Sequence, residues 1–450
     1  MKKATILVID GGGRGAVLVD KYCQSRHVTQ VLAVPGNDLM KKLSQKPVDI
    51  FPKIKTTDIL SIIKICQSEK VDLVDVVQDD AVAKGVVDAL QNEGIRVFGP
   101  TKAASQIEWD KAWARNFMKK FKIPAPEFKI CKSSQEGIDF IKSQKRGEWF
   151  IKTSGLAAGK GALYAKDNHQ AIQKINQMKD FGKAGQTYLI EKCLVGEEFS
   201  SFAIVDGSNF VLLGHAQDHK PVFDGDLGPN TGGMGCSSPP MAITKKIEKQ
   251  IKNIFKKTTE GLVKIGRSYR GILYLGGMID KNGMVYVIEF NARWGDPEAQ
   301  VIIPSIKNDF YELANQVLDG GIKKIKIKKD NSYRIAVTAA SRGYPSDYSK
   351  VIGKQIFGLD HLLNQFTSSR HPERSEGSYK IFGAGVKIHN SKYLVNGGRL
   401  FYVTTAGKNV AQARKIAYNA LSLVNVESDN LHYRTDIGWR DLERFYGKTF

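Results

Sequence analysis

The sequence predicts an α/β and α+β protein built from three parts. Short apolar, β-branched runs alternate with helical patterns over the first hundred residues, which is typical of a parallel sheet covered by helices. Strands separated by glycine turns dominate from about residue 128, and a third group of strands, followed by one helix, begins near residue 332. The length of 450 residues fits this division, because domains average roughly 150 residues.

The first part is expected to cover residues 1–102 and to end at the turn Gly99-Pro100-Thr101. Its apolar runs predict strands at 5–9, 31–34, 73–77 and 96–98, with helices at 59–68 and 82–92. The second part is expected to cover 103–330. It opens with Asp110, a candidate helix N-cap, because apolar residues follow at helical spacing at 113, 117 and 121. Further strands are expected at 149–153, 187–190, 199–205, 210–215, 271–280 and 284–290, with a long basic amphipathic helix at 247–265.

The third part, residues 331–450, reads as a small α+β domain. Strands are expected at 334–339, 381–388 and 400–405, and a helix at 410–424. The segment 368–378 carries almost no apolar residue and interrupts strand-like sequence, so we interpret it as a solvated insertion loop.

The chain is strongly basic, since 67 Lys and Arg against 46 Asp and Glu give a net charge of +21. A basic surface attracts nucleic acid, but these lysines are spread along the chain rather than clustered with aromatic residues. Acidic small substrates such as phosphates explain the excess equally well. Binding of nucleic acid is therefore kept only as a weaker alternative.

Several features favour a cytoplasmic protein. The five cysteines are scattered, without a Cys-x-x-Cys pair, which argues against a disulfide framework and against structural zinc. No window approaches 18 uninterrupted apolar residues, so no membrane span is expected. The apolar run near the N-terminus is too short for a signal peptide and ends in Asp10 and a glycine loop.

Two glycine-rich loops are candidate phosphate sites. The first, Gly11 to Ala16, fits the Gly-x-Gly-x-x-Ala dinucleotide pattern, but the acid expected after the second strand is missing, which disfavours a nicotinamide site. An anion at the helix N-terminus and a plain tight turn both remain open. The second loop begins at Lys152 and ends in Gly159-Lys160-Gly161 between two strands. It is not a P-loop, and either a flap over phosphates or a surface hairpin fits it.

Three further segments carry candidate ligands. The strand end at 191–198 can offer backbone groups to an adenine and a carboxylate to a ribose, although solvated charges are the simpler interpretation. Glu289 and Asn291 are two apart on a strand and share a face, which suits Mg²⁺, with an ion-pair network as the alternative. The polar, glycine-dense stretch 217–235 indicates a functional loop, in which His219 is expected to be a hydrogen-bonding rather than a catalytic residue.

In this order, these segments resemble the glycinamide ribonucleotide synthetase family of ATP-grasp ligases. The likeness rests on Lys-x-x-Gly-Leu-Ala-Ala-Gly-Lys-Gly from Lys152, Gln-Asp-His-Lys from Gln217, Gly-Pro-Asn-Thr-Gly-Gly-Met-Gly from Gly228, Glu-Phe-Asn from Glu289 and Arg-x-Gly-Asp-Pro-Glu from Arg293. The Gly228 element is highly specific to that family, whereas the ATP-grasp parts are shared more widely. The likeness runs nearly end to end and includes segments 99–104, 343–345, 397–399 and 433–438.

The resemblance implies a central ATP-grasp domain with a flap subdomain at about 125–192. It implies that ATP, glycine and 5-phosphoribosylamine give glycinamide ribonucleotide, ADP and phosphate through a glycyl-phosphate intermediate, with Mg²⁺ or Mn²⁺. We expect a monomer without a membrane or nucleic-acid partner.

The resemblance also implies residue roles. ATP contacts fall on Lys111, Lys152, Gly159, Lys160, Gly161, Glu191, Lys192, Leu194 and Glu198, and metal ligands on Glu289 and Asn291. Substrate contacts fall on Gly13, Arg14, Lys220, Asn230, Thr231, Gly233 and Gly295, and catalytic roles on Asp218, Arg293 and Asp296.

Two loops depart from the family pattern. Arg14 is followed by Gly-Ala-Val where the family has Glu-His-Ala, and residues 78–83 read Gln-Asp-Asp-Ala-Val-Ala where it has Gly-Pro-Glu-Ala-Pro-Leu. Either the family tolerates this variation, which we favour, or the acceptor amine differs. A non-catalytic nucleotide-binding protein is a third hypothesis, which the Glu289/Asn291 pair and the two loop lysines, Lys152 and Lys160, disfavour.

Overall fold

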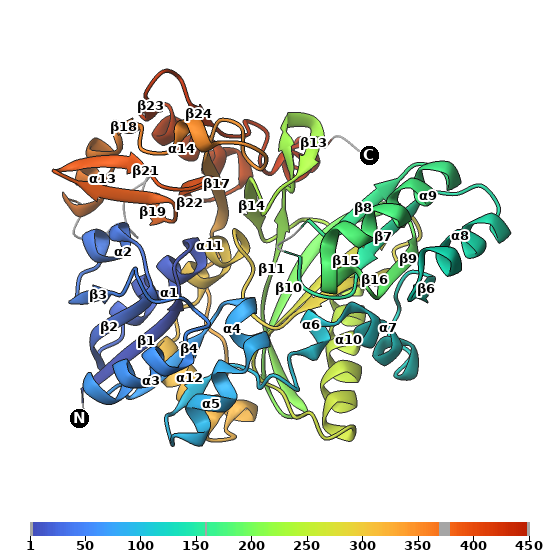
Figure 1. Cartoon of the computed structure of the whole chain (residues 1–450). Coiled ribbons are helices and arrows are strands. Elements are labelled where there is room, and N and C mark those ends of the chain that lie inside the picture. Colours follow the sequence, from blue (N-terminus) through green and yellow to red (C-terminus); the bar gives the residue numbers. More distant parts are fainter. Residues whose placement is uncertain (1–2, 158–159, 369–378, 448–450) are drawn as a thin grey trace.

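The computed structural model describes residues 3–157, 160–368 and 379–447. Figure 1 shows an N-terminal unit, a central sheet, a flap that projects to one side, and a C-terminal unit above the sheet. The predicted insertion loop at 368–378 lies outside the described residues, except for Ser368 at the end of a helix.

The N-terminal unit confirms the predicted parallel sheet. Its strand order is β3-β2-β1-β4-β5, and every pairing is parallel. Alternate residues of β1 pack into two different cores, because side chains alternate across a strand: Ile6 and Val8 face α1, whereas Leu7 and Ile9 face α3 and α5. The elements are β1 (Ala4–Asp10), α1 (Gly13–Cys23), β2 (Val28–Pro35), α2 (Asp38–Leu43), β3 (Val48–Ile50), α3 (Ile59–Ser68), β4 (Leu73–Val76), α4 (Asp79–Lys84), α5 (Val86–Asn92) and β5 (Val97–Phe98).

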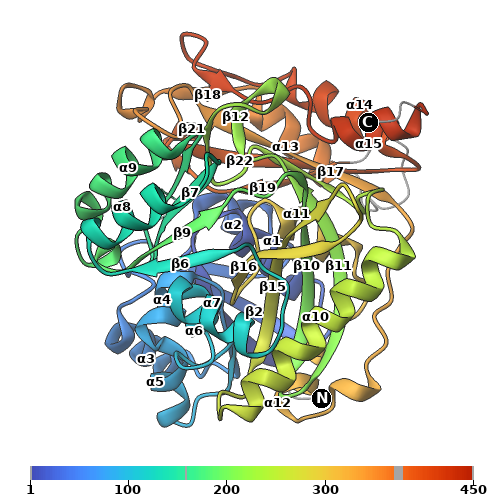
Figure 2. The same cartoon turned by 90° about the vertical axis from the view of Figure 1, so that its right-hand side faces the viewer.

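The flap is a separate antiparallel sheet of order β6-β9-β7-β8. Figure 2 views the molecule from the flap side, with the N-terminal unit behind. The elements of this region are α6 (Gln106–Trp109), α7 (Lys111–Lys120), β6 (Phe128–Cys131), α8 (Ser134–Ser143), β7 (Trp149–Thr153), β8 (Ala162–Ala165), α9 (Asn168–Asn176), η1 (Gln177–Gly185) and β9 (Tyr188–Lys192).

One antiparallel sheet continues from the central part into the C-terminal part, in the order β16-β15-β10-β11-β14-β17-β22-β19, with β24 paired to β17. The pairing of β14 with β17 joins the two parts. The central elements are β10 (Gly196–Asp206), β11 (Asn209–Asp218), β12 (Pro221–Phe223), η2 (Asp224–Asp226), β13 (Leu227–Asn230), β14 (Gly235–Ser238), α10 (Lys245–Lys264), β15 (Arg270–Asp280), β16 (Val285–Asn291), α11 (Glu298–Ile302), η3 (Ile303–Ser305), α12 (Phe310–Leu318) and η4 (Ile322–Lys324).

The C-terminal part adds a four-stranded sheet of order β20-β21-β18-β23. The strands and helices of this part are β17 (Tyr333–Ser341), η5 (Ser349–Val351), β18 (Gln355–Phe357), α13 (Leu359–Ser368), β19 (Tyr379–Gly383), β20 (Val386–His389), β21 (Lys392–Val395), β22 (Arg399–Gly407), α14 (Val410–Leu421), β23 (Asn425–Val426), β24 (Leu431–His432) and α15 (Trp439–Phe445).

Two predicted elements are interrupted. The helix expected at 82–92 is broken by Gly85, whose φ of +92° is left-handed, so that α4 ends and α5 begins there. The single strand expected at 381–388 is wrong: β19 ends at Gly383, β20 starts at Val386, and the two strands lie in different sheets.

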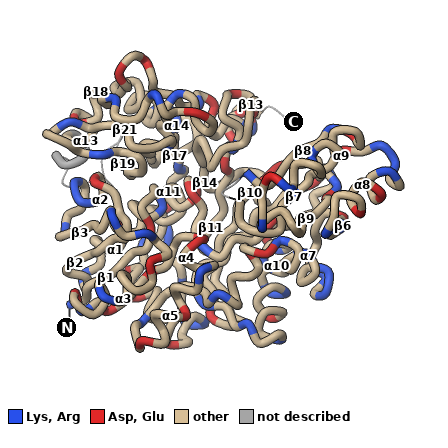
Figure 3. The backbone as a smooth tube through the Cα atoms, viewed as in Figure 1, with Lys and Arg blue, Asp and Glu red and all other residues tan. Residues whose placement is uncertain are grey.

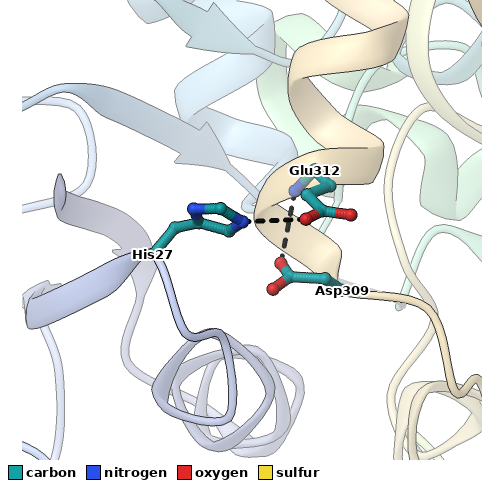
Figure 4. Close-up of side chains that lie close together, drawn as sticks. All are labelled: His27, Asp309 and Glu312. Carbon is teal, nitrogen blue, oxygen red and sulfur yellow. Dashed lines mark hydrogen bonds and ion pairs between the residues drawn. The ribbon is translucent and has the colours of Figure 1, made fainter. Parts of the chain in front are cut away.

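The N-terminal unit is tied to the segment around α12 by polar contacts. His27 Nε2 lies 2.8 Å from Glu312 Oε1, and Asp309 caps α12 (Figure 4). Arg96 pairs with Asp319 at 2.6 Å on the same helix. His27, Asp309 and Glu312 lie close enough to hold a metal, but these interactions and the nearby Arg26 guanidinium already account for them as an interdomain contact.

The positive charge is not concentrated in one place. Figure 3 shows Lys and Arg distributed over the N-terminal unit, the flap, α10 and the C-terminal part. Among the described residues, no helix combines the length and apolarity needed to cross a membrane.

The central sheet carries a core on each face. Phe202 is fully buried on the face that packs against α12, and its ring stacks on Tyr274 at 4.6 Å and on Trp294 at 5.3 Å between centroids. Ala203 and Val205 face the opposite core, which α10 covers. This arrangement fixes Trp294 next to the residues of the candidate site.

Replacing Phe202 by Ala should lower the free energy of unfolding by about 3–5 kcal/mol, because a buried aromatic ring is lost and a cavity remains. Urea denaturation followed by tryptophan fluorescence measures the change. Phe357→Ala is the matched control, since that ring is 48% exposed. A loss no larger than that of the control would contradict the assigned core.

Candidate active site

Three lysines from different elements converge on Glu289, near the end of β16. They are Lys111 at the start of α7, Lys152 on β7 and Lys220 after β11. Burial alone would raise the pKa of Glu289, but these three cations outweigh it, and the pKa lies below its usual value. The cluster therefore holds an ionised carboxylate inside a ring of positive charge.

Asp110 fixes the first of these lysines. Its carboxylate accepts from the Trp113 N–H at 3.0 Å, which confirms the predicted N-cap, and from the Ser154 hydroxyl at 2.8 Å. The Lys111 N–H donates to the Ser154 carbonyl at 3.0 Å. Burial lowers the pKa of the Lys111 ammonium. The cap thus ties α7 to the flap and orients Lys111 between them.

Glu191 on β9 positions Lys152. Its two carboxylate oxygens lie 2.5 Å from Arg115 Nε and 2.7 Å from Lys152 Nζ. Burial would raise the pKa of Glu191, yet the cations of Arg115 and Lys152 bring it down to about 2. Because its charge is already paired, Glu191 is placed to hold Lys152 and the flap strand rather than to reach a ligand alone.

The connection after β9 offers a backbone edge. The Lys192 N–H donates to the Glu127 carbonyl and the Cys193 N–H to the Glu148 carbonyl, whereas the Leu194 N–H has no acceptor among the described residues. Glu198, at the start of β10, is 52% exposed and lies 3.1 Å from Lys220 Nζ. Its charge is the main reason why the pKa of Lys220 is raised.

Asn291 and Arg293 continue the site from Glu289. Asn291 Nδ2 lies 3.4 Å from Glu289 Oε1, which shows that both side chains share one face of β16 as predicted. Arg293 Nη2 donates to Asn291 Oδ1 at 3.0 Å and pairs with Glu108 Oε1 at 3.0 Å. Glu108, on α6, also accepts from the Ala292 N–H at 2.7 Å.

Asp218 and Gly233 bring two loops together. Gly233 has a φ of +114°, and an added Cβ would lie 2.3 Å from Pro297 Cδ and 2.7 Å from Asp218 Oδ1, so only glycine fits. Burial, and next the Glu298 carboxylate, raise the pKa of Asp218 well above its usual value. Asp218 is thus a half-buried carboxyl at the junction of the loops at 217–235 and 293–298.

Asp296 is contacted from three parts of the chain. Its carboxylate accepts from the Arg14 N–H at 3.3 Å and from Gln300 Nε2 at 2.9 Å, and lies 3.5 Å from Arg399 Nη1. The same Arg399 nitrogen donates to the carbonyls of Asp296 at 2.8 Å and of Gly232 at 2.6 Å.

Arg14 lies buried at the start of α1. Its guanidinium pairs with Asp10 at 2.7 Å, donates to the Trp294 carbonyl at 3.1 Å and donates to Gln78 Oε1. The two loops that depart from the family pattern therefore contact each other. Gly13 precedes Arg14, and a Cβ at Gly13 would lie 2.0 Å from the Tyr402 ring.

The remaining predicted site residues differ in their contacts and in their exposure to solvent. Thr231 donates to the Lys220 carbonyl through its N–H and its hydroxyl, both at 2.8 Å. Lys160, Lys192 and Asn230 are exposed, Gly161 is buried on the flap, and Gly295 packs closely on Glu298. Gly159 lies outside the described residues.

The sequence predicted no role for three residues of the site: Glu108, Arg115 and Arg399. Arg115 lies one helical turn after Lys111 on α7, and this spacing was the available signal. Arg399 stands in the segment 397–399 that contributed to the resemblance. Glu108 had no distinguishing pattern, because its partner Arg293 lies 185 positions away.

His219 is a hydrogen-bonding residue, as predicted. Its Nε2 accepts from the Gly438 N–H at 3.0 Å, and its Nδ1 lies 3.2 Å from the Gly235 carbonyl. This pairing requires the neutral ring with the proton on Nδ1. Burial is the main cause that lowers the pKa of His219 to about 4.

Comparison with known families matches nearly the whole chain. Residues 4–108, 109–299 and 334–440 match the N domain, the ATP-grasp (A) domain and the C domain of phosphoribosylglycinamide synthetase, respectively.

Curated relatives agree. The phosphoribosylamine–glycine ligase of Escherichia coli K12 is 36% identical over 98% of this chain and 99% of its own length, and that of Caldanaerobacter subterraneus is 35% identical over 96% and 99%. The bovine trifunctional purine biosynthetic protein adenosine-3 is 38% identical over 98% of this chain, but the match spans 42% of its length.

Solved structures show the same arrangement. The phosphoribosylamine–glycine ligase of Thermotoga maritima superposes with a TM-score of 0.77 at 30% identity, covering 96% of this chain and all of its own. The biotin carboxylase domain of Hydrogenobacter thermophilus 2-oxoglutarate carboxylase, solved with MgADP, has a TM-score of 0.71 at 15% identity over 96% and 92% of the two chains; it shares the fold.

His219 should remain neutral, with its proton on Nδ1, down to about pH 5, because burial disfavours the charged ring. Its pKa is lower in the folded than in the unfolded state. Its contribution to stability is therefore complete above about pH 6.5 and is lost as the pH falls through about 4. NMR of ¹⁵N-histidine-labelled protein checks this, with His219→Gln assigning the signal. Titration of that signal near pH 6.5 would contradict the burial described.

Proposed function

The chain belongs to the phosphoribosylglycinamide synthetase family, and on this premise we propose that it joins glycine to 5-phosphoribosylamine with conversion of ATP to ADP and phosphate. Membership of the family makes it an ATP-grasp ligase of purine biosynthesis. One observation of the structure carries the assignment of the site: Lys111, Lys152 and Lys220 surround Glu289 where the flap, α7 and the central sheet meet. Such a set of cations suits a polyphosphate.

The donor set at the end of β16 fits a hard divalent cation. Glu289 is an ionised carboxylate, and Asn291 adds an amide on the same face, only 5% exposed. We assign these two residues as ligands of Mg²⁺ or Mn²⁺. The ion, when bound, neutralises charge on the phosphates of ATP. Arg293 holds the Asn291 amide through the 3.0 Å hydrogen bond to Oδ1.

Phosphoryl transfer needs positioning and neutralisation of charge rather than a protein nucleophile. A carboxylate oxygen of glycine attacks the γ-phosphorus, the bond to the β,γ-bridging oxygen breaks, and ADP leaves. Lys111 and Lys152 contribute positive charge at the phosphates, and Glu191 holds Lys152 in place at 2.7 Å. We assign the flap loop at Lys160 and Gly161 to exclude water from the resulting acyl phosphate.

The nucleotide is oriented by the connection after β9. The Leu194 N–H, which has no acceptor within residues 3–157, 160–368 and 379–447, and the Lys192 backbone suit an adenine edge, and the exposed Glu198 carboxylate suits the ribose hydroxyls. The connection follows β9, which pairs with β7 of Lys152, so we place the phosphates between this connection and Glu289.

The second step takes place at the loop junction. The amine nitrogen attacks the carbonyl carbon of glycyl phosphate, a C–N bond forms, phosphate leaves, and the nitrogen loses a proton. Asp218, whose pKa burial raises well above its usual value, is the carboxyl that we assign to exchange this proton. Arg293 and Asp296, with the backbone of Gly233 and Gly295 and the side chains of Lys220, Asn230 and Thr231, hold the substrates.

The acceptor site is assigned to Gly13 and Arg14 at the start of α1. A helix N-terminus and a guanidinium both favour a phosphate or carboxylate. The contact between Arg14 and Gln78 joins the two unusual loops, so these residues are where a different acceptor amine would be selected. Phosphoribosylamine remains the preferred acceptor, since the rest of the site follows the family pattern.

The proposal also includes the domain boundaries, the oligomeric state and the cellular location expected from the sequence. The domains divide at 102/103 and 330/331, the protein acts as a monomer, and it is located in the cytoplasm. The proposed partners are small-molecule substrates, as expected for a ligase.

The decisive assay measures ADP release with ATP and glycine, with and without phosphoribosylamine generated in situ, and identifies the product by mass spectrometry. Glycine- and amine-dependent ADP release with formation of glycinamide ribonucleotide is expected. A much higher kcat/KM with another amine would keep the ligase class and refute the acceptor.

Glu289→Ala should reduce turnover by 10²–10³-fold, about 3–4 kcal/mol in the barrier, because an electrostatic contact to the reacting phosphates is lost. Steady-state kinetics at saturating Mg²⁺ measures the effect. Glu69→Ala, at an exposed position after α3, is the control. Near-normal turnover of Glu289→Ala would refute the metal assignment.

Arg14→Ala should raise the KM of the acceptor amine by about 10–150-fold and leave that of ATP nearly unchanged, because a charge-assisted contact is worth about 1.5–3 kcal/mol and ATP lies at another site. Arg26→Ala, an exposed arginine of the same unit, is the control. Since the change also strands the buried Asp10, kinetics are compared well below the melting temperature of the variant. Equal changes in the two KM values would count against the assignment.

A further inference from the structure

A C-terminal segment, residues 432–440, lies along the loop at residues 219–235, which we call the substrate loop. His432 Nε2 lies 2.9 Å from the Val222 carbonyl, and the Gly438 N–H donates to His219 at 3.0 Å. Both contacts fall at β12 or directly before it. They join positions more than 200 residues apart.

Arg434 is the centre of this contact. Its side chain is fully buried, and its guanidinium pairs with Asp226 at 2.8 Å and with both oxygens of Asp436 at 2.7 Å. It also donates to the Pro221 carbonyl at 3.1 Å. Arg440 adds a second pair with Asp226 at 2.6 Å. Because the Arg434 side chain is fully buried, it is not exposed to a substrate.

The C-terminal segment also contacts the turn η2 through Thr435 and Asp436. The Thr435 N–H donates to Asp224 at 2.8 Å, its hydroxyl donates to the same carboxylate, and the Gly225 N–H donates to Asp436 at 2.9 Å. Asp226 has a φ of +57°, in the left-handed region that is uncommon for residues other than glycine. The C-terminal segment therefore stabilises a turn that the loop sequence alone disfavours.

The inner end of the same hairpin carries the assigned substrate residues. Asn230 ends β13, and Thr231 donates twice to the Lys220 carbonyl. The loop holds few apolar side chains and many glycines, so ordering it costs conformational entropy that would otherwise be taken from substrate binding.

We propose that Arg434, through Asp226 and Asp436, is a positioning residue that holds the substrate loop in its binding conformation before substrate arrives. The identity of the substrates rests on the proposed function. The C-terminal part thereby acts on the affinity for glycine and for the acceptor amine, although these residues do not touch either molecule.

The test uses Asp226→Asn and Thr435→Val in the full chain, two changes that leave the buried Arg434 in place. We expect the KM of glycine and of the acceptor amine to rise about 10-fold while the KM of ATP stays within about twofold. Hydrogen–deuterium exchange of amides 222–231 should become faster in both variants. Arg342→Ala is the matched control, because it breaks an exposed pair with Asp429 in the same domain.

Wild-type KM values together with wild-type exchange in both variants would overturn the proposal, as would an equal rise in the KM of ATP. If the wild-type protein does not use phosphoribosylamine, the proposed function fails, but hydrogen exchange still decides whether the segment orders the loop. Restoration of slow exchange in the double variant Asp226→Asn/Arg434→Gln, which offers the asparagine a neutral partner, would support direct coupling of the two side chains.

Discussion

The carboxylate of Asp296 is the point at which the three parts of the chain meet. It accepts from the N-terminal unit through the Arg14 N–H, from α11 through Gln300, and lies beside Arg399 of the C-terminal part. Burial would raise its pKa, but Arg399 and Arg14 outweigh burial and lower it, so the carboxylate stays charged. Contacts from all three parts therefore converge on the loop that carries this carboxylate. The residues that we assign to catalysis depend on the assembled molecule and on no single domain.

Neighbouring cations also keep two carboxylates ionised in the part of the site assigned to ATP. Lys152 and Arg115 share one buried carboxylate, Glu191, and three lysines share Glu289. Lys152 belongs to both clusters, and Glu198 lies 3.1 Å from Lys220, so four cations face three carboxylates and most of the charge is already paired inside the protein. The net charge of +21 is instead spread over the N-terminal unit, the flap, α10 and the C-terminal part (Figure 3).

The sequence predicted local features well, because they depend on neighbouring residues. The cap at Asp110, the bounds of α3 and β7, and the shared face of Glu289 and Asn291 all follow from spacing within a few positions. It did not predict Arg115 or Arg399, since their partners lie far away in the chain and ion pairs leave no periodic pattern. The breaks at Gly85 and after Gly383 were missed for a similar reason: apolar periodicity continues across both, while backbone conformation and sheet membership change. The family's known residue order supplied the remaining site assignments.

The pairing of β14 with β17 makes one sheet of the central and C-terminal parts, whereas the flap forms a sheet of its own. Bending between the first two would break the ladder hydrogen bonds between β14 and β17. Among the described residues the flap shares no ladder with that sheet, and the contacts of Ser154 and Glu191 with α7 hold it instead. The central and C-terminal parts are therefore the rigid portion of the molecule, and the flap is the portion that can move against it. A movement of the flap would then leave the junction of the loops at 217–235 and 293–298 undisturbed, so that release of ADP need not move the residues assigned to the other two substrates.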